Sequence, residues 1–309
     1  MEVLPNCPRL KDLRVGFVDG KSSHPETTLR GLLSKVPQDK VLPLDNLELI
    51  SVVTEIDAGI LPHLLSLKSI TLISDPNRTS IVSSHRALWR TFQVEGIRLE
   101  KITARPVTEA LLEYIASYQG LNELALTTVG NSDQQKSDRL ATQLFQKALP
   151  PHVATLQVLR VASKYEDLWC VGEHNIQDLR SLSVLRELEI SFKYGNGQER
   201  GFDFSKIITT VLESIGQMRS LRSLILTCPF KHRKRRWNDH SWAHRARRIE
   251  DSLAIILPSL GTVDAPRYPS SILCGRNHFK LQPADSDITS AQYVVTATAR
   301  GQGDSDIDE

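Results

Sequence analysis

Eight short blocks of the form apolar-x-x-apolar-x-apolar recur along the chain, and this repeat constrains the fold more than any other feature. Successive blocks begin roughly 22–36 residues apart, and recurrence at a period of about 20–50 residues is typical of a solenoid. Each block has the length of one strand. The blocks are Leu10, Leu13, Val15; Leu44, Leu47, Leu49; Leu67, Ile70, Leu72; Leu99, Ile102, Ala104; Leu121, Leu124, Leu126; Leu156, Leu159, Val161; Leu185, Leu188, Ile190; and Leu221, Leu224, Leu226.

Helix-like stretches separate several of these blocks. The clearest covers residues 107–118, where Leu111, Leu112 and Ile115 recur at helical spacing, Pro106 fits the first turn and Gly120 ends the helix. Because a unit of one helix and one strand is too short to bury its own apolar face, neighbouring units are expected to stack. This predicts an α/β fold with parallel strands and further helices over 137–149, 176–182, 206–215 and 248–257.

The blocks resemble leucine-rich repeats, and their irregular, helix-containing spacing is similar to that of the ribonuclease-inhibitor-like class. Residues 111–126 resemble the divergent repeats of fungal F-box/leucine-rich-repeat proteins, although the chain opens into the block at Leu10 with no F-box before it. The resemblance implies a curved solenoid that recognises proteins, as in the substrate-recognition part of an F-box-type ubiquitin ligase. The family's Asn, three residues after the last strand leucine, is absent from all eight blocks.

The resemblance covers residues 5–265 and predicts two regions. Residues 1–265 form the repeat solenoid, with a basic insertion at 229–248. Residues 266–309 form an irregular C-terminal segment with one strand at 291–298 and a disordered tail at 300–309, which is rich in Gly, Ser and Asp.

The residues that alternate with the strand leucines are expected to face the concave surface of such a solenoid. This row has mixed charge and no aromatic residue, which favours a protein partner, whereas nucleic acid favours basic rows with stacking aromatics. The alternative is a solvated sheet face without a partner. The candidates are Asp12, Arg14, Asn46, Glu48, Ser69, Thr71, Lys101, Thr103, Glu123, Ala125, Val158, Arg160, Glu187, Glu189, Ser223 and Ile225.

The segment 231–248 is strongly basic, with eight Lys or Arg residues and one acid, Asp239. Together with Trp237 and Trp242 it could bind nucleic acid or act as a nuclear import signal. It could instead meet an acidic partner, including the acidic residues of 283–309, or remain a solvated loop. The basic side chains at its start are Lys231, Arg233, Lys234, Arg235 and Arg236.

No catalytic or cofactor motif occurs in the sequence. It lacks G-x-S-x-G, G-x-x-x-x-G-K-[ST], H-E-x-x-H and G-x-G-x-x-G. A zinc site from Cys228, His232, His240 and His244 is disfavoured by the surrounding positive charge. The four cysteines are far apart and are expected to be reduced thiols.

These features predict a non-catalytic protein-binding scaffold without cofactor or metal. No signal peptide or membrane span is recognisable, so we expect a cytoplasmic or nuclear protein. The alternative is a nuclear nucleic-acid-associated protein that uses the loop 231–248.

Overall fold

A computed structural model gives the fold of the chain. It describes residues 7, 9–16, 28–34, 36–37, 40–130, 133–192, 204–229, 241–259, 263–264, 268–274, 277–283 and 290–296. The chain forms two compact units, residues 1–161 and 162–309, and each unit is described by itself below.

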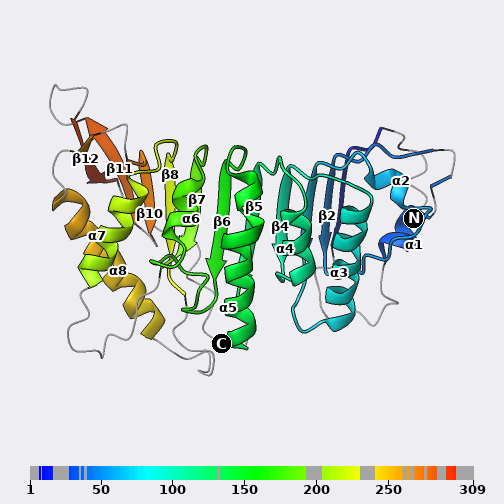
Figure 1. Cartoon of the computed structure of the whole chain (residues 1–309), viewed down its shortest axis with the longest axis horizontal. Helices are drawn as coiled ribbons and strands as arrows, with labels where there is room; N and C mark the ends of the chain where they lie inside the picture. The colour runs from blue at the N-terminus through cyan, green and yellow to red at the C-terminus, as the bar shows by residue number, and fades with distance from the viewer. Residues whose placement is uncertain are drawn as a thin grey trace, which may run out of the picture. The chain divides into compact units, whose positions relative to one another are not determined.

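The first unit is a parallel sheet with helices on one face (Figure 1). Its strands pair in chain order: β1 (Asp12–Gly16), β2 (Asn46–Ile50), β3 (Ser69–Ile73), β4 (Lys101–Arg105) and β5 (Glu123–Val129). The connecting segments contain α1 (Leu29–Leu33), α2 (Leu61–Leu64), α3 (Thr79–Val94), α4 (Glu109–Ala116), α5 (Gln134–Gln143), a π-helical turn η2 (Leu144–Ala148) and a 3-10 turn η3 (Pro150–His152). Strand β6 (Val158–Ser163) contains the boundary to the second unit.

The second unit combines parallel and antiparallel strands. Strands β7 (Glu187–Ser191), β8 (Ser223–Thr227) and β10 (Ser271–Cys274) are parallel neighbours. The sheet continues in antiparallel pairing through β11 (Asn277–Pro283), β12 (Ser290–Val295) and β9 (Val263–Asp264). The helices are α6 (Ile176–Ser181), α7 (Phe204–Ile215) and α8 (Ser241–Ser259).

All eight sequence blocks coincide with strands, β1 to β8, so the predicted α/β class with parallel strands is confirmed. The apolar residues of the blocks are buried from β2 onward, as the pairs Leu47 and Leu49 and Leu124 and Leu126 illustrate. Alternation therefore places them on one face of each strand and leaves the intervening residues exposed or half-buried.

A recurring backbone contact joins several of the strand blocks to the block that follows. The carbonyl of the residue before a strand accepts two N–H groups from the start of the following strand. Lys11 O, for example, accepts from Asp45 N at 2.8 Å and from Asn46 N at 2.9 Å. The same double contact recurs at the carbonyls of Asp45, Lys68, Glu100 and Asn122 in the first unit and of Arg186 in the second.

Several helix boundaries differ from those that the sequence predicts. Helix α4 begins at Glu109 because the Thr108 side chain accepts the Leu111 N–H and caps the helix, so Pro106 lies outside the first turn. Helix α8 begins at Ser241, well before residue 248, so the C-terminal part of the predicted basic loop is helical.

The C-terminal segment contains more strands than its sequence pattern predicts. Strand β12 overlaps the predicted strand at 291–298 but begins at Ser290 and ends at Val295, and β10 and β11 also join the sheet. The proline and glycine residues of this segment obscure the pattern. Strand β10 gains its place by parallel pairing with β8, a contact that local sequence does not reveal.

Buried tyrosine and histidine side chains bind the backbone in the first unit, whose blocks lack the Asn that is typical of leucine-rich repeats. The Tyr114 hydroxyl accepts the Leu99 N–H at 3.2 Å and donates to the Ile97 carbonyl at 2.9 Å. His152 accepts the Leu121 N–H at Nδ1, 3.2 Å away, and its Nε2 lies 2.9 Å from the Ile115 carbonyl oxygen. These bonds hold the chain where it enters β4 and β5.

Buried neutral histidines make the first unit sensitive to acid. Burial lowers the pKa of His85 to about 4, against a smaller opposite effect of the hydrogen bond to the Val52 carbonyl. Burial also lowers the pKa of His63 and of His152. His63 Nδ1 accepts the Leu42 N–H at 2.9 Å, a bond that requires an unprotonated nitrogen.

We expect the free energy of unfolding to decrease as the pH falls below 6.5. The unfolded His85 takes up a proton near pH 6.5, whereas the folded residue does so only near pH 4, so the unfolded state binds more protons between these values. The contribution of neutral His85 to the free energy of unfolding is fully present above pH 6.5, and about 2 kcal/mol of this free energy is lost by pH 5. Urea unfolding followed by circular dichroism at pH 7.5, 6.0 and 5.0 measures this loss.

Two variants assign the acid sensitivity to burial. His85→Gln should reduce the dependence of the free energy of unfolding on pH, and Gln93→Ala, at an exposed position without a titratable side chain, should leave it unchanged. A wild-type stability that is flat from pH 7.5 to 5.0 would contradict the neutral, buried state of these rings.

Candidate functional site

The first unit presents a polar surface made by the side chains that alternate with its buried leucines. Strand register places these side chains in two rows that cross β1 to β5. The first row is Asp12, Asn46, Ser69, Lys101 and Glu123, and the second is Arg14, Glu48, Thr71, Thr103 and Ala125. We call these ten residues, together with the exposed Arg160 of β6, the strand face.

Cross-strand pairs organise the charges of the strand face. Arg14 Nε lies 3.2 Å from Glu48 Oε1, and Lys101 Nζ lies 2.7 Å from Glu123 Oε1. The Asn46 amide donates to Asp12 Oδ1. Exposed pairs of this kind contribute about 0–1 kcal/mol each to stability, so the strand face is substitutable without loss of the fold.

Apart from Val158 of β6, the remaining predicted face residues lie on the second unit. Glu187 and Glu189 alternate with buried residues of β7 and are half-buried. Their register partners on β8 are Ser223 and Ile225, respectively. In this unit, too, these positions alternate with buried residues, but the side chains at them are more acidic and more apolar than those of the strand face.

The basic side chains Lys231, Arg233, Lys234, Arg235 and Arg236 lie outside the described residues. His232 and His240, two of the four zinc candidates, lie there as well. In the ranges that the structure describes, no group of three or more His, Cys, Asp or Glu side chains is placed to hold a metal ion. None of the helices in those ranges has the length and apolar composition that a membrane span requires.

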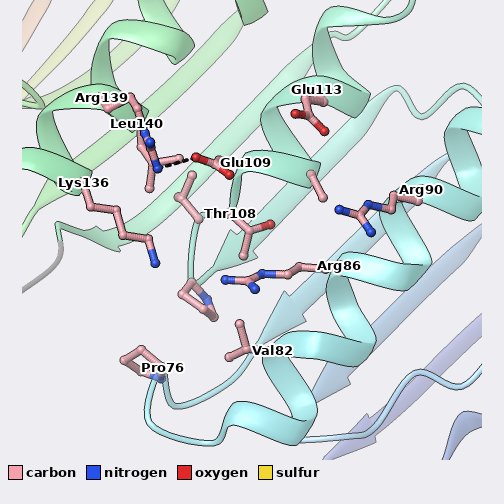
Figure 2. Close-up of a pocket in the computed structure, with 13 residues that line it drawn as sticks. Pro76, Val82, Arg86, Arg90, Thr108, Glu109, Glu113, Lys136, Arg139 and Leu140 are labelled. Carbon is pink, nitrogen blue, oxygen red and sulfur yellow. Dashed lines mark ion pairs between the residues drawn. The ribbon is translucent and has the colours of Figure 1, made fainter.

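A pocket of about 410 Å³ lies among α3, α4 and α5 of the first unit (Figure 2). Pro76, Pro106 and Val107, from the loops that follow β3 and β4, form part of its wall. Its charged lining residues are Arg86 and Arg90 on α3, Glu109 and Glu113 on α4, and Lys136 and Arg139 on α5.

The lining charges of the pocket are unevenly paired. Arg139 Nη2 forms an ion pair with Glu109 Oε1 at 2.5 Å. Arg86, Arg90 and Lys136 form no ion pair with any residue in the described part of the chain. Figure 2 shows the heads of Arg86 and Lys136 approaching from α3 and α5 toward the space beside Thr108.

The sequence pattern does not predict this pocket. The available signal is a pair of arginines four residues apart, Arg86 and Arg90, followed by Lys136 and Arg139 three residues apart. Such spacing indicates only that each pair shares one helix face. The two helix faces meet across α4 because of how the helices pack. The periodicity of apolar residues does not predict this packing.

Comparisons with protein-family models, with curated proteins and with solved structures found no match to this chain.

Proposed function

We propose that this chain is a leucine-rich-repeat solenoid that recognises a protein partner through the strand face. The observation that carries the proposal is the register of two polar rows over five parallel strands. A repeat array offers its partner an extended surface in which each strand contributes the same positions.

The composition of the strand face supports a protein partner. Acidic, basic and hydroxyl side chains alternate across the rows, and neighbouring charges are already paired, as Arg14–Glu48 and Lys101–Glu123 show. A surface without excess positive charge offers little attraction to a phosphate backbone. Polar side chains with mixed charge instead suit the rim and hydrogen bonds of a protein interface.

The resemblance of residues 111–126 to fungal F-box/leucine-rich-repeat proteins suggests which process the recognition serves. We propose substrate recognition for a ubiquitin ligase, with the strand face as the surface that contacts the substrate. The basic segment 231–248 is the alternative binding element, for nucleic acid, and the test below separates the two.

A photo-crosslinking amino acid at Thr71 tests the proposal because this side chain lies at the centre of the second row. We expect it to crosslink to one or a few proteins in extract from the source cell. The matched control position is Gln93, which is exposed near the end of α3. Lys101→Glu should weaken the crosslink at Thr71 at least about tenfold, because a misplaced charge in an interface costs more than 1.4 kcal/mol.

Two results would argue against the strand face. Equal crosslinking from Thr71 and Gln93 would mean that the contacts are not specific. Recovery of nucleic acid that disappears when residues 231–248 are deleted would favour the basic segment. Circular dichroism of each variant separates lost binding from lost folding.

A further inference from the structure

The pocket on the helical side of the first unit arises from unequal helix lengths. Helix α3 has 16 residues and α4 has eight, which correspond to about 24 and 12 Å. Helix α5, which continues into η2, again extends over more residues. The short α4 therefore lies between two longer neighbours, and residues from all three helices line the pocket that results.

The charges around the pocket leave two cations without an acidic counterpart. Arg139 is neutralised by Glu109 through their ion pair. Glu113 is the other lining acid, and in Figure 2 its carboxylate lies on the side of Arg90. Arg86 and Lys136 remain, one on each side of the pocket, and the pocket thus carries an excess of two positive charges.

The N-terminus of α4 adds hydrogen-bond donors to the same space. Thr108, Glu109 and Ala110 all line the pocket. The first-turn N–H groups of Glu109 and Ala110 have no acceptor among the residues that the structure describes. Free N–H groups and the positive end of the helix dipole favour an anion at this position.

We propose that this pocket binds a phosphate monoester in its dianionic form. Two excess cations match the charge of about −2 that a phosphate monoester carries at neutral pH. The Arg86 guanidinium suits bidentate contact with phosphate oxygens, and the Lys136 ammonium contributes a second, point-like charge. A volume of about 410 Å³ lies in the range of small-ligand sites and accommodates the group that carries the phosphate.

Isothermal titration calorimetry of the full chain with O-phosphoserine and with a phosphoserine peptide tests the proposal. We expect measurable binding at low ionic strength that weakens with added salt, and none with the unphosphorylated peptide. Equal affinity for both probes indicates a free phosphate monoester as the ligand. Much tighter binding of the peptide indicates a phosphorylated protein segment.

Paired substitutions locate the binding. Arg86→Gln with Lys136→Gln should weaken the binding of O-phosphoserine at least about tenfold, because each removes a charge-assisted contact. The control, Arg98→Gln with Lys147→Gln, removes the same charge from exposed positions of the same unit outside the pocket and should leave affinity within about twofold.

The proposal is overturned if neither phosphorylated probe binds, or if both double variants lower affinity equally. Since the four exchanged side chains carry none of the buried core, each variant should retain the wild-type circular dichroism spectrum and melting temperature. Crosslinking at the strand face does not depend on this pocket, so failure here leaves that proposal standing.

Discussion

Replacing Leu124 by Asp is expected to abolish the cooperative folding of the first unit. The Leu124 side chain is fully buried in β5, and register places it beside Ile102 of β4. An unpaired carboxylate at this position costs several kcal/mol, and the cavity left by the leucine adds to that cost. The sum approaches the total stability of an ordinary domain, about 5–15 kcal/mol. Circular dichroism and urea unfolding should show no cooperative transition for this unit.

Ala125→Asp is the matched control because it places the same charge on the next residue. Ala125 is half-buried and belongs to the strand face, on the opposite side of β5. Alternation predicts that this variant folds and loses at most about 1–2 kcal/mol. If Leu124→Asp gave a folded protein of near wild-type stability, the assignment of the block leucines to the core would be wrong.

Replacing Trp89 by Ala is expected to lower the free energy of unfolding by about 3–5 kcal/mol. Trp89 lies on α3 and is 2% exposed. Its ring stacks on Tyr114 of α4, with centroids 5.3 Å apart, and meets Phe92 edge-on at 6.1 Å. The substitution therefore removes both a large buried surface and the packing between neighbouring helices. Urea unfolding followed by circular dichroism at 222 nm gives the loss.

Two further variants of α3 test whether packing causes this loss. Trp89→Phe keeps an aromatic ring and should recover part of the lost stability. Val94→Ala lies on the same helix, but Val94 is 81% exposed, so we expect a change within about 0.5 kcal/mol. Equal effects of Trp89→Ala and Val94→Ala would contradict the buried aromatic cluster.

The sequence predicts the strands far better than the connections between them. Each strand carries its own signal, because a residue pair such as Leu124 and Leu126 must point to one face and the intervening Ala125 to the other. The same alternation leaves the side chains of the strand face exposed or half-buried. The predicted helices lie roughly where expected, but the long helix α3 is not predicted, and helix ends depend on caps such as Thr108.

The features that sequence reasoning misses depend on contacts between distant segments. The Tyr114 hydroxyl binds backbone groups of Ile97 and Leu99. The spacing of apolar residues does not predict these hydrogen bonds. Strand β10 pairs with β8 across more than 40 residues of chain. The pocket combines side chains from three helices, so no local spacing reveals Arg86 and Lys136 as neighbours.

The double hydrogen bond at the start of β2 to β6 and of β8 means that insertions between strands and insertions within strands have different effects. Because a carbonyl such as that of Lys68 anchors both Glu100 and Lys101, residues can be gained or lost between two anchors without shifting the strand that follows. A single insertion inside a strand, by contrast, turns its leucines outward. The segments between strands can therefore change in length while the strands keep their register. Each such change alters only the helical side of the sheet. New pockets can arise there without disturbing the surface on the opposite face of the sheet.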